Sequence, residues 1–344
     1  MRLLITPYDY SGKPGVSHTG LHISSLNTMK VLRQSGIDCL VFPVVGAFPH
    51  KDRTGEDIDT LIQRHNPTHV VTCAFWIPPA EVQRLVLKWP YVEFAINCHS
   101  NIAFLQAEPG GLKMARALVD LEQTSHNFHL SGNSREFVST VESAWESPCA
   151  YLPNLYYVDH TVREYRRQWQ GGPLRIGAFG ALRPLKNPTV SAFAALDIAR
   201  NLSTDLEFYI NVGRNDGWGD RTLRSVHEII DNLPYAKLIE VPWQSWPEHR
   251  RTVRHMHLLL QPSFTESFNL VTADGAAEGI PSVVSNAIEW APWNWKADPD
   301  STLQVARTGL ALLFDRSAGR DGLHALQRNN AAGVSAWEVF LNRG

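Results

Sequence analysis

Two carboxylates, Glu266 and Asp274, first suggest chemistry in this chain. They lie in the stretch 262–285, whose pattern predicts a strand end, a polar turn, a helix, a glycine stop and a new β-branched strand. An α-helix has about 3.6 residues per turn, so an eight-residue step alone would leave the two side chains about 80° apart. With Glu266 in the turn before the helix, both carboxylates can still face one cleft.

The start of this predicted helix offers a second chemical feature. The amides of Phe268, Asn269 and Leu270 are expected in its first turn, where amides lack partners within the helix. Such an end attracts anions, and phosphate above all. The alternative interpretation is an ordinary strand–turn–helix unit with a solvated acidic face.

Two cations follow an earlier predicted strand. The apolar run 174–179 leads into Gly180, and the next loop carries Arg183 and Lys186. Cations just past the carboxyl end of a strand, beside a glycine that permits close approach, suit a diphosphate group. The alternative is a pair of solvated surface cations.

These two segments resemble the retaining GT-B glycosyltransferases, particularly family 4. In that family a Pro-Ser-x-x-Glu-x-Phe-Gly segment precedes a helix with a second Glu; here Asn269 stands at the usual glycine and Asp274 at the second Glu. The resemblance implies that Glu266 lies by the donor sugar and that Asp274 holds the nucleotide ribose. The family also shows Gly-Arg-Leu-x-x-x-Lys, where Lys186 matches the lysine but Ala181 replaces the arginine. Arg183, two residues on, is expected to reach the same phosphate.

Weaker parts of the resemblance lie elsewhere. The loop Tyr10–Val16, with Gly15, follows the first strand where the family's loop approaches donor and acceptor, although a plain turn fits equally. His99 ends a strand as in the family's His-Ser element, and we expect it to face the cleft as a catalytic residue; a capping or loop-bonded histidine is the alternative. Trp243 lies at the position of a loop that runs beside the nucleobase in the resembling family. The alternative is a tryptophan that packs at the edge of a domain.

The alternation of short strands and helices predicts an α/β, doubly wound fold, and the resemblance implies the GT-B arrangement of two facing Rossmann-like domains with a cleft between them. We expect an acceptor-side domain at 1–155, a linker at 156–172, a nucleotide-sugar domain at 173–315 and a crossover helix at 316–344 that packs back on the body. The expected strands are Arg2–Thr6, Asp38–Val44, His69–Cys73, Val92–Cys98, Asn127–Ser131, Ala150–Leu152, Arg175–Phe179, Glu207–Val212, Ala236–Glu240, His257–Gln261, Ser282–Ser285 and Leu310–Phe314, and the first helix is expected at Val16–Ser35 with Gly36 as its C-cap.

Composition narrows the class of protein. Apolar residues make up 44% of the 344-residue chain and charged residues 19%, typical of globular domains. The formal net charge of −2 and the lack of a basic tract argue against non-specific nucleic-acid binding. The four cysteines are widely spaced without a Cys-x-x-Cys pair, so we expect buried, reduced thiols in a cytoplasmic protein. We expect no signal peptide and no transmembrane segment, because no apolar run approaches about 20 residues.

Metal and aromatic features complete the sequence picture. Asp298 and Asp300 imitate an Asp-x-Asp metal motif, but their proline-rich loop does not follow a strand, so no metal cofactor is expected. Asp57 and Asp59 are expected in a helix. The cluster of Trp290, Trp293 and Trp295, with Trp337, suits packing of the final helix Val334–Leu341, a carbohydrate platform, or a peripheral membrane contact.

The resemblance implies a retaining glycosyltransferase that moves a sugar from a nucleotide-diphosphate donor to a carbohydrate or other hydroxyl acceptor by a metal-independent, front-face mechanism. The main alternative is a non-catalytic GT-B protein that binds a nucleotide sugar or glycan. A GT-B epimerase or phosphorylase ranks lower, since a phosphorylase needs a pyridoxal lysine and a much longer chain.

Overall fold

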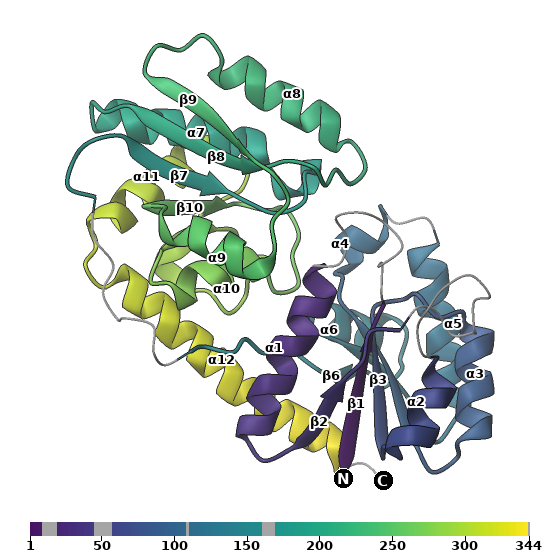
Figure 1. Cartoon of the computed structure of the whole chain (residues 1–344). Helices are drawn as coiled ribbons and strands as arrows, with labels where there is room; N and C mark the ends of the chain where they lie inside the picture. The colour runs from purple at the N-terminus through teal and green to yellow at the C-terminus, as the bar shows by residue number, and fades with distance from the viewer. Residues whose placement is uncertain (9–18, 45–56, 108–109, 160–168, 343–344) are drawn as a thin grey trace. The chain divides into compact units, whose positions relative to one another are not determined.

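The computed structural model of this chain describes residues 1–8, 19–44, 57–107, 110–159 and 169–342. These form two compact units, one of residues 1–157 with 329–344 and one of residues 158–328. Each unit is built around its own parallel sheet, as Figure 1 shows.

The sheet of the first unit has the order β2-β1-β3-β4-β5-β6, with every pair parallel. Strand β3 is buried at all five positions, because helices cover both faces of a parallel sheet and leave no polar face. Its strands are β1 (Arg2–Pro7), β2 (Asp38–Val41), β3 (His69–Cys73), β4 (Glu93–Cys98), β5 (Phe128–Gly132) and β6 (Ala150–Tyr151).

The helices of the first unit follow local capping signals. Helix α1 begins at Gly20, later than the expected Val16, because the Thr19 side chain caps it by accepting from the His22 amide at 3.4 Å. Gly36 follows its end with a φ of 85°, as expected for a glycine that stops a helix. The helices are α1 (Gly20–Gln34), α2 (Ile58–His65), α3 (Pro79–Lys88), α4 (Ile102–Leu105), α5 (Gly111–Thr124) and α6 (Arg135–Ala144).

The second unit has the strand order β11-β10-β7-β8-β9, again parallel throughout. The predicted strand Leu310–Phe314 is wrong: these residues end helix α11 (Thr302–Phe314), since a short apolar run also fits a buried helix. The other elements are β7 (Leu174–Ala178), η1 (Pro184–Lys186), α7 (Pro188–Asn201), β8 (Leu206–Asn211), α8 (Gly219–Ile230), β9 (Ala236–Val241), α9 (Trp246–Arg254), β10 (Leu258–Gln261), α10 (Leu270–Ala277), β11 (Ser282–Val284) and η2 (Trp293–Trp295).

The last helix, α12 (Ala318–Leu341), contributes to both units and is yellow in Figure 1. Its end joins the core of the first unit, where Trp337, Phe340 and Leu341 are buried with side chains of β1 and β2. The Trp337 indole donates to the Pro153 carbonyl at 2.9 Å. The predicted helix Val334–Leu341 is therefore the last third of a much longer helix.

The four cysteines are buried and free of disulfides, as expected. Burial raises the pKa of Cys39 to about 12 and that of Cys73 to about 11, so both thiols are protonated at neutral pH. In the described part of the chain, no helix is both long enough and apolar enough to cross a bilayer.

Candidate functional site

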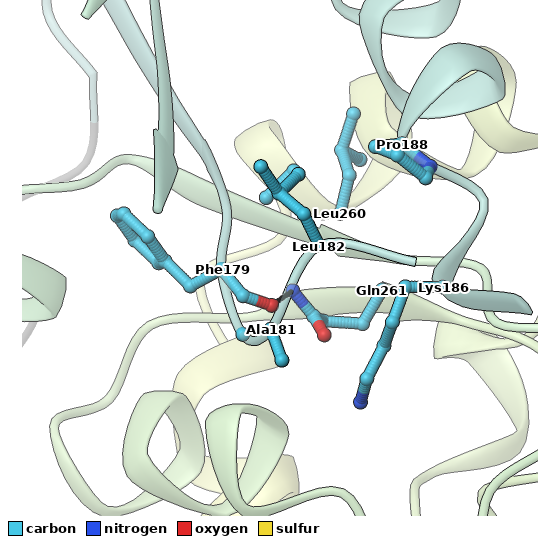
Figure 2. Close-up of a pocket in the computed structure, with 9 residues that line it drawn as sticks. Phe179, Ala181, Leu182, Lys186, Pro188, Leu260 and Gln261 are labelled. Carbon is cyan, nitrogen blue, oxygen red and sulfur yellow. Dashed lines mark hydrogen bonds between the residues drawn. The ribbon is translucent and has the colours of Figure 1, made fainter. Parts of the chain in front are cut away.

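A hollow opens at the carboxyl ends of β7 and β10 in the second unit (Figure 2). The Leu182, Leu260 and Pro188 side chains lie together on one side of it, whereas the amino group of Lys186 points the other way. The Gln261 amide donates to the Phe179 carbonyl at 3.2 Å and so ties the ends of β10 and β7 together. The hollow is lined by Ala178, Phe179, Gly180, Ala181, Leu182, Lys186, Pro188, Leu260 and Gln261.

Gly180 makes the turn that brings Lys186 back over the end of β7. Its φ of 114° lies in the left-handed region that favours glycine. A Cβ at Gly180 would lie 3.7 Å from Cε and 3.9 Å from Nζ of Lys186, so the lysine packs directly on the glycine. The Gly180 amide donates to Oδ1 of Asn211 at 2.9 Å, which fixes this turn to the end of β8.

Lys186 and Glu266, 80 residues apart in sequence, form an ion pair between Nζ and Oε1. The same carboxylate oxygen lies 3.2 Å from both the Ser263 hydroxyl and the Asn269 amide, which donate to it. Both ion-pair side chains are mostly buried, with 16% of Lys186 and 8% of Glu266 exposed. The structure thus brings these predicted site residues together.

Charge, not burial, sets the state of the carboxylate. Burial alone would raise the pKa of Glu266, but Lys186 and Arg183 outweigh it and hold that pKa below its ordinary value. Burial lowers the pKa of Lys186, and Arg183 and Arg214 add to this, while Glu266 opposes it. Glu266 is therefore ionised at neutral pH, with cations around it.

Helix α10 begins at Leu270, two residues later than predicted. Asn269 has a φ of 62°, which is not helical, and its Oδ1 accepts from the Thr272 amide at 2.9 Å as an N-cap. The unbonded first-turn amides therefore belong to Leu270 and Val271 rather than to Phe268 and Asn269. Phe268 is instead buried beside Trp290, whose indole donates to its carbonyl at 2.7 Å.

Asp274 is buried on α10 and faces α9. Its Oδ1 accepts from the Trp246 indole at 2.8 Å, and its Oδ2 lies 3.6 Å from Nε2 of His249. Burial lowers the pKa of His249, although Asp274 opposes this, so the imidazole is neutral at neutral pH. Sequence reasoning missed both α9 partners, and the contact of Asp274 with a ribose stays a prediction.

Arg183 belongs to a second charged group at the same sheet edge. Its Nη1 lies 3.7 Å from Oδ2 of Asp216, and Oδ1 of that carboxylate lies 3.7 Å from Nε of Arg214. The Arg214 guanidinium stands 5.3 Å above the ring of Trp243. Sequence reasoning did not single out Arg214; the available signal was Gly213-Arg214 directly after a strand, as with Gly180 and its cations.

Two predicted site residues, His99 and Gly15, belong to the first part of the chain. His99 belongs to the first unit, where Nε2 lies 3.5 Å from the Asn97 amide nitrogen, and burial lowers its pKa to about 4. Gly15 and the rest of the loop Tyr10–Val16 fall outside the described residues. The roles proposed for these two residues stay predictions.

The acidic pairs considered for metal binding have other partners. Asp298 accepts from the Asp300 amide at 3.0 Å within their own turn. Asp57 caps α2 by accepting from the Thr60 amide at 2.7 Å, while Asp59 pairs with Lys88 at 2.8 Å. Within the ranges that the structure describes, no group of three or more His, Cys, Asp or Glu side chains is arranged to hold a metal ion.

The tryptophan cluster serves several contacts. Trp295 is fully buried against α12, where a Cβ at Gly322 would lie 2.2 Å from its ring. Trp337 packs the end of the same helix, as expected for the final helix Val334–Leu341, whereas Trp295 contacts α12 earlier, outside that range. Trp290 instead lies beside Phe268, with the two rings tilted by 31°, and Trp293 is 81% exposed.

No protein-family model matches the sequence, and no curated protein matches it. Solved structures do match the fold. A UDP-forming α,α-trehalose-phosphate synthase from Burkholderia xenovorans gives a TM-score of 0.66 at 13% identity, covering 99% of this chain and 98% of that one. HepE from Anabaena, in complex with UDP and glucose, gives 0.61 at 13% identity, with 99% of each chain covered.

TarM from S. aureus, in a complex that contains UDP, gives a TM-score of 0.60 at 10% identity and covers 79% of this chain. The chain spans 55% of the length of that TarM structure. These neighbours are GT-B glycosyltransferases, which confirms the GT-B fold expected from the sequence. At identities this low, the likeness establishes the fold alone.

Proposed function

We propose that this protein is a retaining glycosyltransferase of the family 4 type, which moves a sugar from a nucleotide-diphosphate donor to a hydroxyl acceptor. The observation that carries the proposal is the mostly buried Lys186–Glu266 pair, set between the Gly180 turn and the start of α10. It combines a cation for a diphosphate with a carboxylate for the sugar attached to it. Nucleotide complexes of the structural neighbours HepE and TarM support this class of donor.

The charges explain how such a site would lower the barrier. When the bond between the anomeric carbon and the diphosphate oxygen breaks, its electron pair stays on the diphosphate and the sugar ring becomes positive. Lys186 and Arg183, with the Leu270 and Val271 amides, would stabilise that growing negative charge more than they stabilise the ground state. The ionised Glu266 lies beside Lys186, where it can contact the hydroxyls of the sugar.

The acceptor completes the reaction from the same face. Its hydroxyl oxygen bonds to the anomeric carbon on the side from which the diphosphate leaves, so the configuration is retained. The hydroxyl proton passes to the departing phosphate oxygen. Because Lys186 and Arg183 already provide positive charge for the diphosphate, we propose that the reaction proceeds without a metal ion.

A non-catalytic binding protein is the second candidate, and one observation favours it. Asp274, the residue proposed to hold the ribose, already accepts a hydrogen bond from Trp246. A donor bound less firmly at its ribose would be held without being placed for reaction. Turnover separates the two candidates directly.

The test is a screen of UDP-, GDP- and ADP-sugars, read by thermal unfolding and by release of the nucleoside diphosphate. A ligand at 100 times its Kd adds about 2.7 kcal/mol to the free energy of unfolding. Lys186→Ala should lose both signals, whereas Lys237→Ala, which removes an exposed lysine of β9, should keep them. Stabilisation without release would favour the binding protein, and no response to any nucleotide sugar would contradict both candidates.

A further inference from the structure

Arg214 is placed at the same sheet edge as Lys186 by the loop that follows β8. The loop is tied to the one after β7 by two backbone hydrogen bonds, from the Leu182 amide to the Arg214 carbonyl at 3.0 Å and from the Asp216 amide to the Leu182 carbonyl at 2.9 Å. Gly213 permits this path, because its φ of 89° lies in the left-handed region. The backbone at Arg214 is therefore fixed relative to the turn that carries Arg183 and Lys186.

The side chain of Arg214 is held from two sides. Asp216 lies 3.7 Å from its Nε, and the ring of Trp243 lies 5.3 Å below its guanidinium. An arginine stacked on an indole keeps its charge and loses little freedom on binding an anion, because its planar group is already oriented. With 35% of the side chain exposed, the guanidinium remains accessible to a ligand.

The charge of Arg214 acts on the Lys186 site. Both Arg183 and Arg214 lower the pKa of Lys186 by repulsion, so the three cations share one electrostatic environment. Asp216 is shared between the two arginines and contacts each at 3.7 Å. Ala181, where the resembling family has an arginine, lines the same hollow and brings no charge.

We propose that Arg214 is a further anion-binding residue of this site, which contacts the diphosphate of the donor, with Trp243 and Asp216 as its positioning residues. This inference rests on the proposed function and deepens it. Trp243 then orients a cation with the ring face that would otherwise be offered to a nucleobase.

The experiment compares binding of pyrophosphate, UDP and uridine by calorimetry. Arg214→Ala should weaken pyrophosphate and UDP about 10- to 100-fold, the range for one lost charge-assisted hydrogen bond, and leave uridine unchanged. Arg214→Lys should retain part of the affinity, because the charge remains. Ala181→Arg, added to Arg214→Ala, should recover affinity by returning a cation to the hollow.

Arg200→Ala is the matched control, because it removes the same charge from the last turn of α7, at the opposite end of the sheet. It should leave all three affinities unchanged. If Arg214→Ala bound pyrophosphate and UDP as Arg200→Ala does, or if the wild-type chain did not bind pyrophosphate, the inference would be overturned. If the wild type bound pyrophosphate through Arg214 but neither UDP, GDP nor ADP, the anion site would stand and the proposed donor would fall.

Trp243 has its own test. Trp243→Leu should weaken pyrophosphate, whereas Trp243→Phe should retain most of the affinity because it keeps an aromatic face. Uridine should bind all three proteins equally. Loss of uridine affinity equal to the loss of pyrophosphate affinity in Trp243→Leu would instead assign Trp243 to the base and overturn its positioning role.

Discussion

The carboxyl ends of the two sheets carry different side chains in the described parts of the chain. In the first unit, neutral side chains bond across the strand ends: Thr6 bonds Thr72 at 3.1 Å, and the Asn97 amide donates to the Leu152 carbonyl at 3.0 Å. His99 is neutral there as well, since burial lowers its pKa to about 4. In the second unit, the corresponding edge carries Lys186 with Glu266, and Arg183 and Arg214 with Asp216.

The difference shows that two parallel sheets in one chain can present two kinds of chemistry. Parallel strands bring their following loops to a shared edge in both units, and the residue types in those loops then decide what the edge can bind. A charged edge suits an anionic donor, and a neutral hydrogen-bonding edge suits an uncharged acceptor rich in hydroxyls. We therefore expect salt and charge changes to act through the second unit, and histidine titration to act through the first.

The largest expected effect comes from Lys186. Lys186→Ala should lower turnover by about 10²- to 10³-fold, the scale for losing one group that stabilises developing charge. The fold should survive, because the lysine lies at the edge of the hollow and outside the apolar core, so thermal unfolding checks for damage. Arg183→Ala should lower turnover by a smaller factor. Near-normal turnover in Lys186→Ala would remove the lysine from the diphosphate site.

The next effect separates the two carboxylates. Asp274→Asn should weaken binding of the nucleoside diphosphate by about 1–3 kcal/mol, if a ribose hydrogen bond is left unmet. Its amide oxygen can still accept from Trp246, so α9 and α10 should remain packed. Glu266→Gln should instead lower turnover and leave that affinity nearly intact, because Lys186 keeps its charge. Calorimetry beside steady-state rates measures the split, and an equal loss of affinity in both variants would refute it.

Smaller effects should appear in how stability depends on pH. Burial lowers the folded-state pKa of His99 below its ordinary value. The contribution of this histidine to the free energy of unfolding is therefore present above about pH 6.5 and is lost as pH falls toward about 4. The pKa of His129 is raised: burial opposes protonation, but Glu122 and Glu93 outweigh it. The contribution of His129 to the free energy of unfolding is therefore present below about pH 6.5 and is lost as pH rises through the raised pKa.

Urea unfolding measured across pH should show the pH-dependent contribution of each histidine to stability. His99→Gln should flatten the acid side of the stability curve, and His129→Gln the alkaline side. The two variants serve as controls for each other. An unchanged acid side in His99→Gln would mean that the pKa of this imidazole is the same in the folded and unfolded protein.

The smallest expected effect is that of a chelator. We expect full activity in excess chelator, because Lys186 and Arg183 supply the positive charge at the diphosphate. Asp298→Asn should likewise leave turnover unchanged, since its carboxylate caps its own turn. Activity that vanished with chelator and returned with manganese would implicate Asp298 and Asp300.

The sequence predicted those parts of the site that local signals encode. A strand, a glycine and a cation identified the Gly180 turn, and a strand followed by a polar turn identified Glu266, which the structure brings against Lys186. Their catalytic roles stay predictions. The α/β fold followed from the alternation of elements, although the run Leu310–Phe314 was taken for a strand because helix and strand patterns coincide over five apolar residues.

What the sequence could not reveal depends on tertiary pairing. Asn269 caps α10 with a positive φ, which moved the helix start beyond the predicted amides. Trp246 reaches Asp274 across 28 residues, and Arg214 meets the β7 loop only because two strands are neighbours in the sheet. No local motif predicts such partners, since their contacts form only once the strand order is set.

Helix α12 has a consequence for the order in which the chain can fold during synthesis. The second unit, residues 158–328, is complete before the last residues of α12 are made, whereas the first unit needs residues 329–341 to finish its core. Until Trp337, Phe340 and Leu341 arrive, the faces of β1 and β2 that they cover stay exposed. The first unit is thus the first to be synthesised and the last to complete its core, because residues 1–157 can bury that core only after residues 329–341 have been made.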